Sequence, residues 1–212
     1  SSLDLEKYLT TICEELARAF GLPQAGVALL IADGTHEMVI AEYRTPDRPS
    51  AIGIVIPIQG NQATQTAIET RAPIVLENAQ TDPHPIPLHP LEKQRGAAAL
   101  LIVPLIVRDR VIGTLGLESA QASPRKFTEA EMAFAQNVAS AASQVIESAR
   151  LTTELRQELA ERKHAEDNLR RRNVELDALN VTTLGLINRR DPDELLESIM
   201  ARAAALMNTS HG

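Results

Sequence analysis

The amino-acid sequence predicts an α+β domain, in which helices flank an antiparallel sheet, followed by a long α-helical coiled coil. The sheet is predicted by two apolar, β-rich runs at residues 97–107 and 111–119, which a short charged turn joins as in a hairpin. The long helix is predicted by residues 128–184, which include neither Gly nor Pro. At 1.5 Å per residue this helix would be about 85 Å long, well beyond the size of one globular domain.

The second arm of the predicted hairpin separates its side chains into two faces, since successive residues of a strand point to opposite sides. One face carries Val111, Gly113, Leu115 and Leu117, and the other carries Ile112, Thr114, Gly116 and Glu118. Because Gly116 leaves free space and Glu118 adds a carboxylate, we expect a small cavity with a polar edge there. The first arm lacks polar alternation, so we expect it to be covered on both faces. Pro104 cannot donate to a ladder and predicts a bulge or a change of neighbour.

Composition and charge exclude several classes of protein. Of the 212 residues 44% are hydrophobic but only 2% aromatic, so Leu, Ile, Val and Ala must build the core. A net charge of -7 argues against a nucleic-acid partner, which needs a cationic surface for its phosphates. The single cysteine excludes an intrachain disulfide and is typical of a reducing compartment. We find no signal peptide or membrane span, and the chain begins with Ser rather than Met. We therefore expect a cytoplasmic fragment of a longer protein, without direct membrane contact.

The remaining elements of the predicted domain follow along the chain. Apolar residues at helical spacing predict a first helix from Asp4 to Phe20, with Cys13 buried and inert on its apolar face. Strands are predicted at residues 27–32, 38–43, 52–58 and 74–76, and a short helix at residues 60–71. Residues 77–91 include four of the chain's prolines and predict a loop, since proline disrupts both helices and ladders.

Several of these segments resemble the GAF sensory domain in their order. They are residues 60–70, 72–76 and 81–83, then Arg95-Gly-Ala97, Leu101-Ile-Val-Pro-Leu105, Val111-Ile-Gly-Thr-Leu-Gly-Leu117 and Phe127-Thr-Glu-Ala-Glu131. The resemblance covers residues 5–151. It implies a GAF-type antiparallel sheet flanked by helices, with the loop at residues 77–91 covering a ligand cavity. It also implies that the chain is part of a bacterial multidomain signal-transduction protein of the sensor histidine kinase type.

The long helix begins at a capping box, Thr128 to Glu131, and its second half predicts a coiled coil. Beyond Leu151 charged residues dominate, and a sparse apolar seam remains. In a heptad register, Thr152, Leu159, Glu166, Asn173 and Asn180 occupy a positions, while Leu155, Arg162, Leu169, Leu176 and Thr183 occupy d positions. Because an isolated helix this polar is poorly stabilised, we expect a homodimer through the long helix, with the two chains parallel.

The chain therefore predicts three parts. Residues 1–150 form a GAF-like sensor domain and residues 151–190 a signalling coiled-coil linker. Residues 191–212 form the first helix of a truncated second GAF-like domain, because Asp191 caps a helix that repeats the cap and apolar face of the first one.

No catalytic motif is found, so this segment is predicted not to be an enzyme. The single Cys13, in the first helix, argues against covalent attachment of a tetrapyrrole, and the cyclic-nucleotide signature of the family is missing. His84 and His89 lack partners at ligand-like spacing, which disfavours a heme or metal site, and no cofactor is identified. The candidate ligand-binding residues are Thr64, Thr66, Asp82, His84, Arg95 and Glu118, among which Arg95 is placed to hold an anion.

The predicted function is that of a regulatory sensor module. It binds an unidentified small molecule or acts as a dimeric input, and it passes a conformational change through the coiled coil to an output domain, a histidine kinase. The first alternative is a ligand-free dimerisation and spacer domain. The second is the input domain of a cyclic-dinucleotide enzyme.

Overall fold

The structure is a computed structural model, which describes residues 2–32, 34–80, 83, 93–120, 125–187 and 192–206. The chain divides into two compact units, Ser1–Thr153 and Glu154–Gly212. The first unit contains the whole sheet. The second contains the later part of the long helix and a short final helix.

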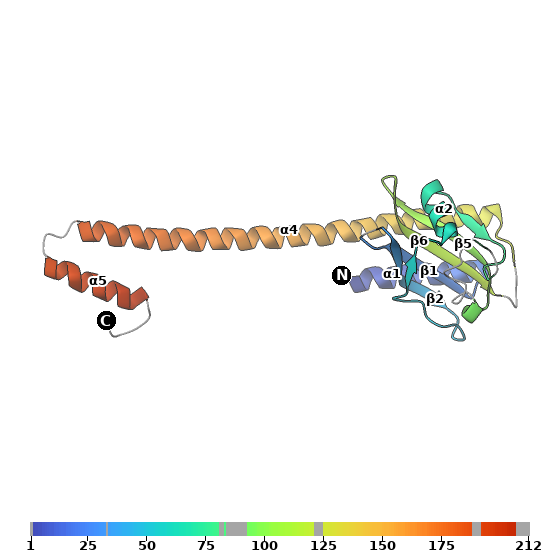
Figure 1. Cartoon of the computed structure of the whole chain (residues 1–212), viewed down its shortest axis with the longest axis horizontal. Coiled ribbons are helices and arrows are strands. Elements are labelled where there is room, and N and C mark those ends of the chain that lie inside the picture. Colours follow the sequence, from blue (N-terminus) through green and yellow to red (C-terminus); the bar gives the residue numbers. More distant parts are fainter. Residues whose placement is uncertain are drawn as a thin grey trace. The chain divides into compact units, whose positions relative to one another are not determined.

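In the described residues the first unit is built on a six-stranded antiparallel sheet with the strand order β3-β2-β1-β6-β5-β4 (Figure 1). The strands are β1 Gln24–Leu30, β2 His36–Arg44, β3 Val55–Pro57, β4 Ile74–Leu76, β5 Ala97–Val107 and β6 Arg110–Ala120. The long strands lie inside the sheet and the two shortest form its edges. Short edge strands leave few unpaired backbone groups for another chain to pair with. The α+β fold with an antiparallel sheet is confirmed.

The predicted hairpin is β5 and β6, joined by a tight turn. Arg108 and Asp109 both have positive φ, 45° and 63°, which matches the twist of a two-residue hairpin turn. Strand β5 is buried from Ala97 to Leu105, as expected for a strand covered on both faces. Pro104 pairs with β6, and the register shifts one residue later, between Leu105 and Ile106. The irregularity that the proline predicted is therefore present next to it.

The third predicted strand, residues 52–58, is shorter in the structure. Strand β3 covers only Val55–Pro57, although Gly53 and Ile54 also exchange backbone hydrogen bonds with Val39 of β2. The preceding residues form a turn, in which the backbone N–H of Ile54 donates to the carbonyl of Ala51 at 2.8 Å. Gly53 has a φ of 79°, which an extended strand excludes. The apolar character of Ile52 and Ile54 suggested a strand, but the glycine between them directs a turn.

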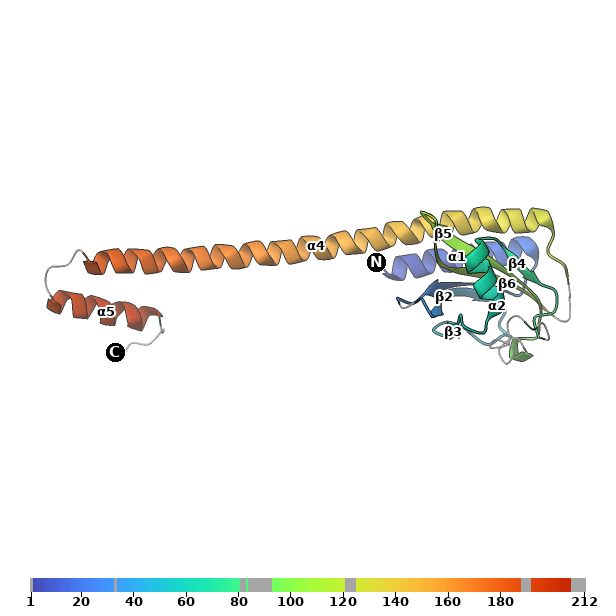
Figure 2. The same cartoon turned by 45° about the horizontal axis from the view of Figure 1, so that its top comes forward.

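Helices cover both faces of the sheet (Figure 2). Helix α1, Ser2–Phe20, and the first part of helix α4, Glu129–Ile187, pack on one face. Helix α2, Gln62–Thr70, packs on the other face, against β4 and β5. The capping box at the start of α4 is present, since the backbone N–H of Glu131 donates to the Thr128 hydroxyl and that of Thr128 donates to the Glu131 carboxylate.

The main core lies between the sheet and the two long helices. It contains Leu9, Cys13 and Leu16 of α1, Val27 of β1, Leu101 and Val103 of β5, Leu115 and Leu117 of β6, and Ala135, Ala139, Ala142 and Ile146 of α4. The alanines of α4 let that helix approach the sheet closely. Ile146 is the one large aliphatic side chain among these four buried residues of α4. Cys13 is fully buried as expected, and its burial raises the pKa of the thiol to about 12.

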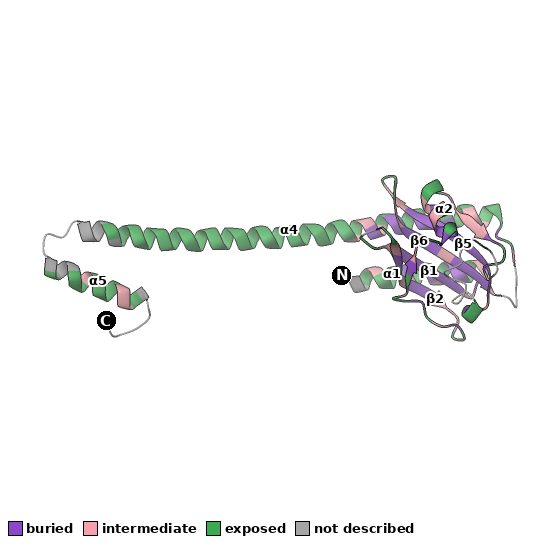
Figure 3. Ribbon diagram, in the orientation of Figure 1, coloured by how far each residue is buried: buried purple, intermediate pink, exposed green. Residues whose placement is uncertain are grey.

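The later part of α4 is exposed in every described residue from Leu151 onward (Figure 3). The seam leucines Leu155, Leu159, Leu169 and Leu176 are each more than half exposed. A final helix, α5, spans Pro192–Leu206, while the predicted cap Asp191 lies outside the described residues. Within the described part of the chain, no helix combines the length and apolar character needed to cross a membrane.

Candidate functional site

A pocket lies on the face of the sheet opposite α1 and α4, between the sheet, α2 and the β2–β3 loop. Its free space, measured as the volume that the centre of a water molecule can reach, is about 80 Å³. Besides two glycines, its apolar lining consists of Val27, Ala28, Val39, Ala51, Ile56, Leu100 and Ile102. Its polar lining consists of Gln24, Glu42, Thr64, Arg95, Thr114 and Glu118. This is the cavity with a polar edge that the β6 pattern predicts.

Two glycines form the floor of the pocket. Gly26 of β1 and Gly116 of β6 are direct register partners, and both line the pocket. A Cβ added at Gly116 would meet its nearest atoms at 4.0 Å, and one at Gly26 at 3.5 Å, so both positions have room for a methyl group. The free space therefore exists because both strands lack a side chain at the same place.

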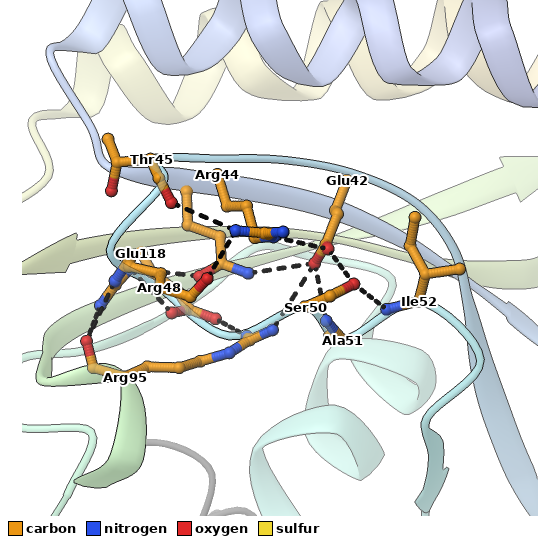
Figure 4. A network of polar contacts seen from close by, with 10 residues as sticks. Glu42, Arg44, Thr45, Arg48, Ser50, Ala51, Ile52, Arg95 and Glu118 are labelled. Carbon is orange, nitrogen blue, oxygen red and sulfur yellow. Dashed lines mark hydrogen bonds and ion pairs between the residues drawn. The ribbon is translucent and has the colours of Figure 1, made fainter.

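Three buried charged residues of the pocket lining, Glu42, Arg95 and Glu118, belong to one cluster, a network of polar contacts (Figure 4). The Arg95 Nη1 donates to Glu118 Oε1 at 2.6 Å, and the Arg48 Nη1 donates to Glu118 Oε2 at 3.2 Å. Glu118 thus holds one arginine on each carboxylate oxygen. Both arginines and the glutamate are at least 90% buried, so these ion pairs are shielded from solvent.

Arg48 joins three parts of the first unit to one another. It lies in the loop between β2 and β3, and its Nε and Nη2 donate to the backbone carbonyl of Arg95 at 3.0 and 2.6 Å. Its Nη1 also donates to Gln24 of β1 at 3.3 Å and to Glu118 of β6. Arg48 therefore closes the β2–β3 loop over the end of the pocket.

Glu42 of β2 is the second buried carboxylate of the cluster. Its oxygens accept hydrogen bonds from the Ser50 hydroxyl, from the backbone N–H of Ala51 at 2.9 Å and from the side-chain amide of Gln24 at 3.3 Å. The Nε of Arg44 lies 3.4 Å from it. These partners satisfy Glu42 without Arg95, whose Nη2 lies 3.7 Å away, beyond hydrogen-bond distance.

Arg95 has donors that the described residues leave unused. It lies directly before β5, where Gly96, with a φ of 62°, turns the chain into the strand. Its Nε and Nη2 are buried, and no described residue accepts a hydrogen bond from either of them. Buried donors without a partner are rare because they lose hydration without compensation. Arg95, which lines the pocket, therefore has two buried donors without an acceptor among the described residues.

A buried carboxyl group lies beside the other end of the pocket. Glu37 of β2 is 3% exposed, and its Oε2 accepts a hydrogen bond from the hydroxyl of Thr114 at 2.8 Å. Burial raises the pKa of Glu37 from its ordinary value of 4.5 to about 7, while the hydrogen bond from Thr114 opposes the rise. Near neutral pH this group is divided between its two protonation states.

The six candidate residues differ in where they lie. Thr64, Arg95 and Glu118 line the pocket. Thr66 is not among the lining residues. It lies two positions after Thr64 in α2, and side chains two positions apart on a helix point to different sides. Asp82 and His84 lie outside the described residues, as does His89.

Sequence reasoning missed three polar residues of the pocket end, Gln24, Glu42 and Arg48. Gln24 and Glu42 lie at the end of strands β1 and β2, where polar residues are common and carry no specific signal. Arg48 lies in a loop, and nothing in the local sequence shows that this loop folds over β6, 70 residues further on. Among the described residues, no three His, Cys, Asp or Glu side chains gather as a metal site would require.

Known protein structures share this fold. The blue-light absorbing form of the Thermosynechococcus elongatus PixJ GAF domain aligns with a TM-score of 0.62 and 19% identity, over 73% of this chain and 92% of that one. The GAF domain of a phosphoenolpyruvate-protein phosphotransferase from Coxiella burnetii aligns with a TM-score of 0.61 and 20% identity, over 71% and 86%. A GAF domain/HD domain protein from Geobacter sulfurreducens aligns with a TM-score of 0.60 and 18% identity, over 70% and 95%.

At these identities the structural similarity shows the fold alone. No curated protein sequence matches the chain. A family model described as GAF domain matches residues 2–147, which are more than half of the chain and include the whole sheet and the pocket. The chain belongs to the GAF domain family.

Proposed function

We propose that this chain is the regulatory sensor module of a signal-transduction protein. A small ligand binds in the pocket, the long helix pairs with that of a second copy, and ligand binding changes the state of an output domain. The observation that carries this proposal is the pocket itself, in which a buried arginine, Arg95, keeps two donors without a partner among the described residues. A ligand that accepts these hydrogen bonds stabilises the structure that holds it.

Strand β6 provides a direct route from the pocket to α4. Thr114, Gly116 and Glu118 line the pocket, while the residues between them, Leu115 and Leu117, belong to the core cluster that includes α4. A shift of β6 toward or away from a ligand therefore moves the surface on which α4 packs. Because packed cores accept discrete arrangements more readily than gradual deformation, such a shift favours one of two packings of the helix.

The exposed seam of α4 supports pairing with a second copy. Leu155, Leu159, Leu169 and Leu176 all fall on the a and d positions of one heptad register and are all more than half exposed. Pairing in a parallel coiled coil would bury them, while the polar residues Asn173 and Asn180 at a positions would fix the register. We expect a mass of twice the 23.0 kDa chain in sedimentation equilibrium.

Disulfide formation tests the parallel arrangement. In a parallel coil with this register, Asn173→Cys places two cysteines face to face, and oxidation links the chains. The matched variant Val174→Cys occupies a b position and links poorly. Cys13 does not interfere because it is fully buried. An antiparallel pair or a monomer would give equal, low yields for both variants.

The output domain in this proposal is a histidine kinase, reached through the coil. The support is the resemblance of the chain to tandem GAF modules that precede such kinases, and a cyclic-dinucleotide enzyme is the alternative. Autophosphorylation of the full reading frame, measured with and without the pocket-filling variant Gly116→Val, distinguishes the two outputs and tests the coupling. Kinase activity that is the same in both proteins would contradict regulation through the pocket.

The ligand-free spacer is the second candidate, and one observation favours it. Arg95 and Glu118 already form an ion pair at 2.6 Å, so part of the charge at this end of the pocket is neutralised without a ligand. Thermal unfolding with a panel of metabolites separates the two functions. A sensor gives at least one compound that raises Tm in the native chain but not in Gly116→Val. A spacer gives none, and Gly116→Val then raises Tm by filling empty space.

A further inference from the structure

The unused donors of Arg95 lie on one edge of its guanidinium group. Nε–H and the neighbouring N–H of Nη2 point the same way and are nearly parallel, while Nη1 on the other side is bonded to Glu118. Such an edge matches two oxygens attached to one atom, as in a carboxylate or a phosphate. A single hydroxyl or carbonyl group would satisfy only one of the two donors.

The charges of the surrounding cluster indicate which anion fits. Three arginines, Arg44, Arg48 and Arg95, are joined with two carboxylates, Glu42 and Glu118. The cluster therefore has one positive charge in excess. A monoanion neutralises it, whereas a phosphate dianion would leave an excess negative charge in a buried site, next to two carboxylates.

The remaining lining indicates the rest of the ligand. The walls next to the charged end are aliphatic, with Val39 and Ile56 on one side and Leu100 and Ile102 on the other. The free space of about 80 Å³ gives the pocket room for a small molecule, since a single water needs only about 10–15 Å³. A short hydrocarbon chain with a carboxylate has this size, and a nucleotide or a tetrapyrrole is several times larger.

We propose that the pocket binds a short aliphatic monocarboxylate, whose two oxygens accept hydrogen bonds from Nε and Nη2 of Arg95 and whose hydrocarbon part lies over Gly26 and Gly116. This inference rests on the proposed sensor function and specifies its ligand class. Glu118 acts as the positioning residue, because its bond to Nη1 at 2.6 Å fixes the orientation of the guanidinium and leaves Nε and Nη2 for the ligand.

Isothermal titration of the full chain with isobutyrate, isobutyramide and methyl phosphate tests the ligand class. Isobutyramide has the same shape as isobutyrate but carries no charge. Methyl phosphate also presents two oxygens on one atom, but as a dianion it carries one more negative charge than isobutyrate. We expect isobutyrate to bind at least tenfold more tightly than either of the others. Equal affinity for the amide would overturn the role of Arg95, and tighter binding of methyl phosphate would overturn the charge argument.

Two variants locate the binding. Arg95→Lys keeps the charge but loses the two-donor edge, and we expect at least tenfold weaker binding of isobutyrate. Its matched control is Arg110→Lys, at an exposed position of the hairpin, which leaves the affinity unchanged. Gly116→Val fills the floor of the pocket and abolishes binding, while Ala160→Val on the exposed part of α4 has no effect. If Arg95→Lys fails to fold, the comparison of isobutyrate with isobutyramide in the native chain still decides the question.

The same titrations separate this proposal from the sensor function. Binding of an unrelated metabolite that Gly116→Val abolishes would retain the sensor and reject the carboxylate. Binding of isobutyrate that survives Gly116→Val would reject the pocket as its site. Absence of binding by carboxylates and by the wider panel alike would reject both proposals.

Discussion

Replacing Arg48 by alanine is expected to destabilise the first unit strongly. The side chain is 3% exposed and makes four hydrogen bonds, two to the carbonyl of Arg95 and one each to Gln24 and Glu118. Without it, one oxygen of a buried carboxylate and one buried carbonyl lose their partners. Removal of one member of a buried ion pair costs about 3–5 kcal/mol, and we expect a loss of unfolding free energy in that range.

The single cysteine provides the assay. Cys13 is fully buried in the core of the first unit, so a thiol reagent reaches it only when that unit opens. Helix content, by contrast, would be dominated by the exposed part of α4. When opening and closing are fast relative to labelling, the labelling rate follows the open population. A loss of 3–5 kcal/mol therefore raises the rate roughly 150-fold to 5,000-fold.

Arg44→Ala is the matched control for this measurement. Arg44 belongs to the same cluster, but its side chain is 35% exposed, and it donates to the carbonyl of Arg48 at 2.7 Å. Because water replaces these interactions at a partly exposed site, we expect a loss of about 1 kcal/mol. A labelling rate of Arg48→Ala no higher than that of Arg44→Ala would refute the view that a dehydrated cluster holds the β2–β3 loop.

Three other predictions follow from the sheet and from α4. Gly113→Ala destabilises the first unit by several kcal/mol, because the added Cβ would lie 2.1 Å from a backbone oxygen of β1. Gly116→Ala is the control: its added Cβ would meet its nearest atoms at 4.0 Å, so the midpoint of urea unfolding changes little. Glu37 alone lowers the stability of the native chain by roughly 3 kcal/mol as the pH rises from 4.5 to 7, because its raised pKa makes the folded state bind the proton more tightly than the unfolded state does. Glu37→Gln removes that slope, and urea titrations across this pH range measure it. Leu169→Asn, at a d position, weakens dimerisation in sedimentation equilibrium, while the equally exposed Val174→Asn, at a b position, does not.

The sequence predicts those parts of the site that depend on local periodicity. Alternation along a strand is a local property, so the division of β6 into a pocket face and a core face followed directly from Gly116 and Glu118. The hairpin and the capping box of α4 were also predicted correctly, because each depends on residues that lie close together in the sequence. Thr64 and Thr66 show its limit, because two residues on one helix turn were both assigned to the pocket, although helical geometry turns them to different sides.

The charged end of the pocket could not be predicted in this way. It depends on contacts between segments that lie far apart in the sequence, such as Arg48 with Glu118 and Gln24 with Glu42. Nothing in a single sequence indicates which loop arginine becomes buried. Arg95 was identified as an anion site from its place before the hairpin, but its open edge becomes visible only once the position of every neighbouring acceptor is known.

The buried cluster is difficult to explain by stability alone. Replacing a buried ion pair by apolar groups of similar volume is often neutral or stabilising, so holding together the β2–β3 loop does not require two buried arginines and two buried glutamates. Arg95 in addition keeps two donors without an acceptor among the described residues, which lowers stability further. Sites at which a fold retains an unfavourable arrangement are typically those that serve binding. A carboxylate bound to Arg95 would complete the hydrogen bonds, balance the charge of the cluster and occupy the space over the two glycines. One occupant thus accounts for three features that a purely structural role leaves unexplained.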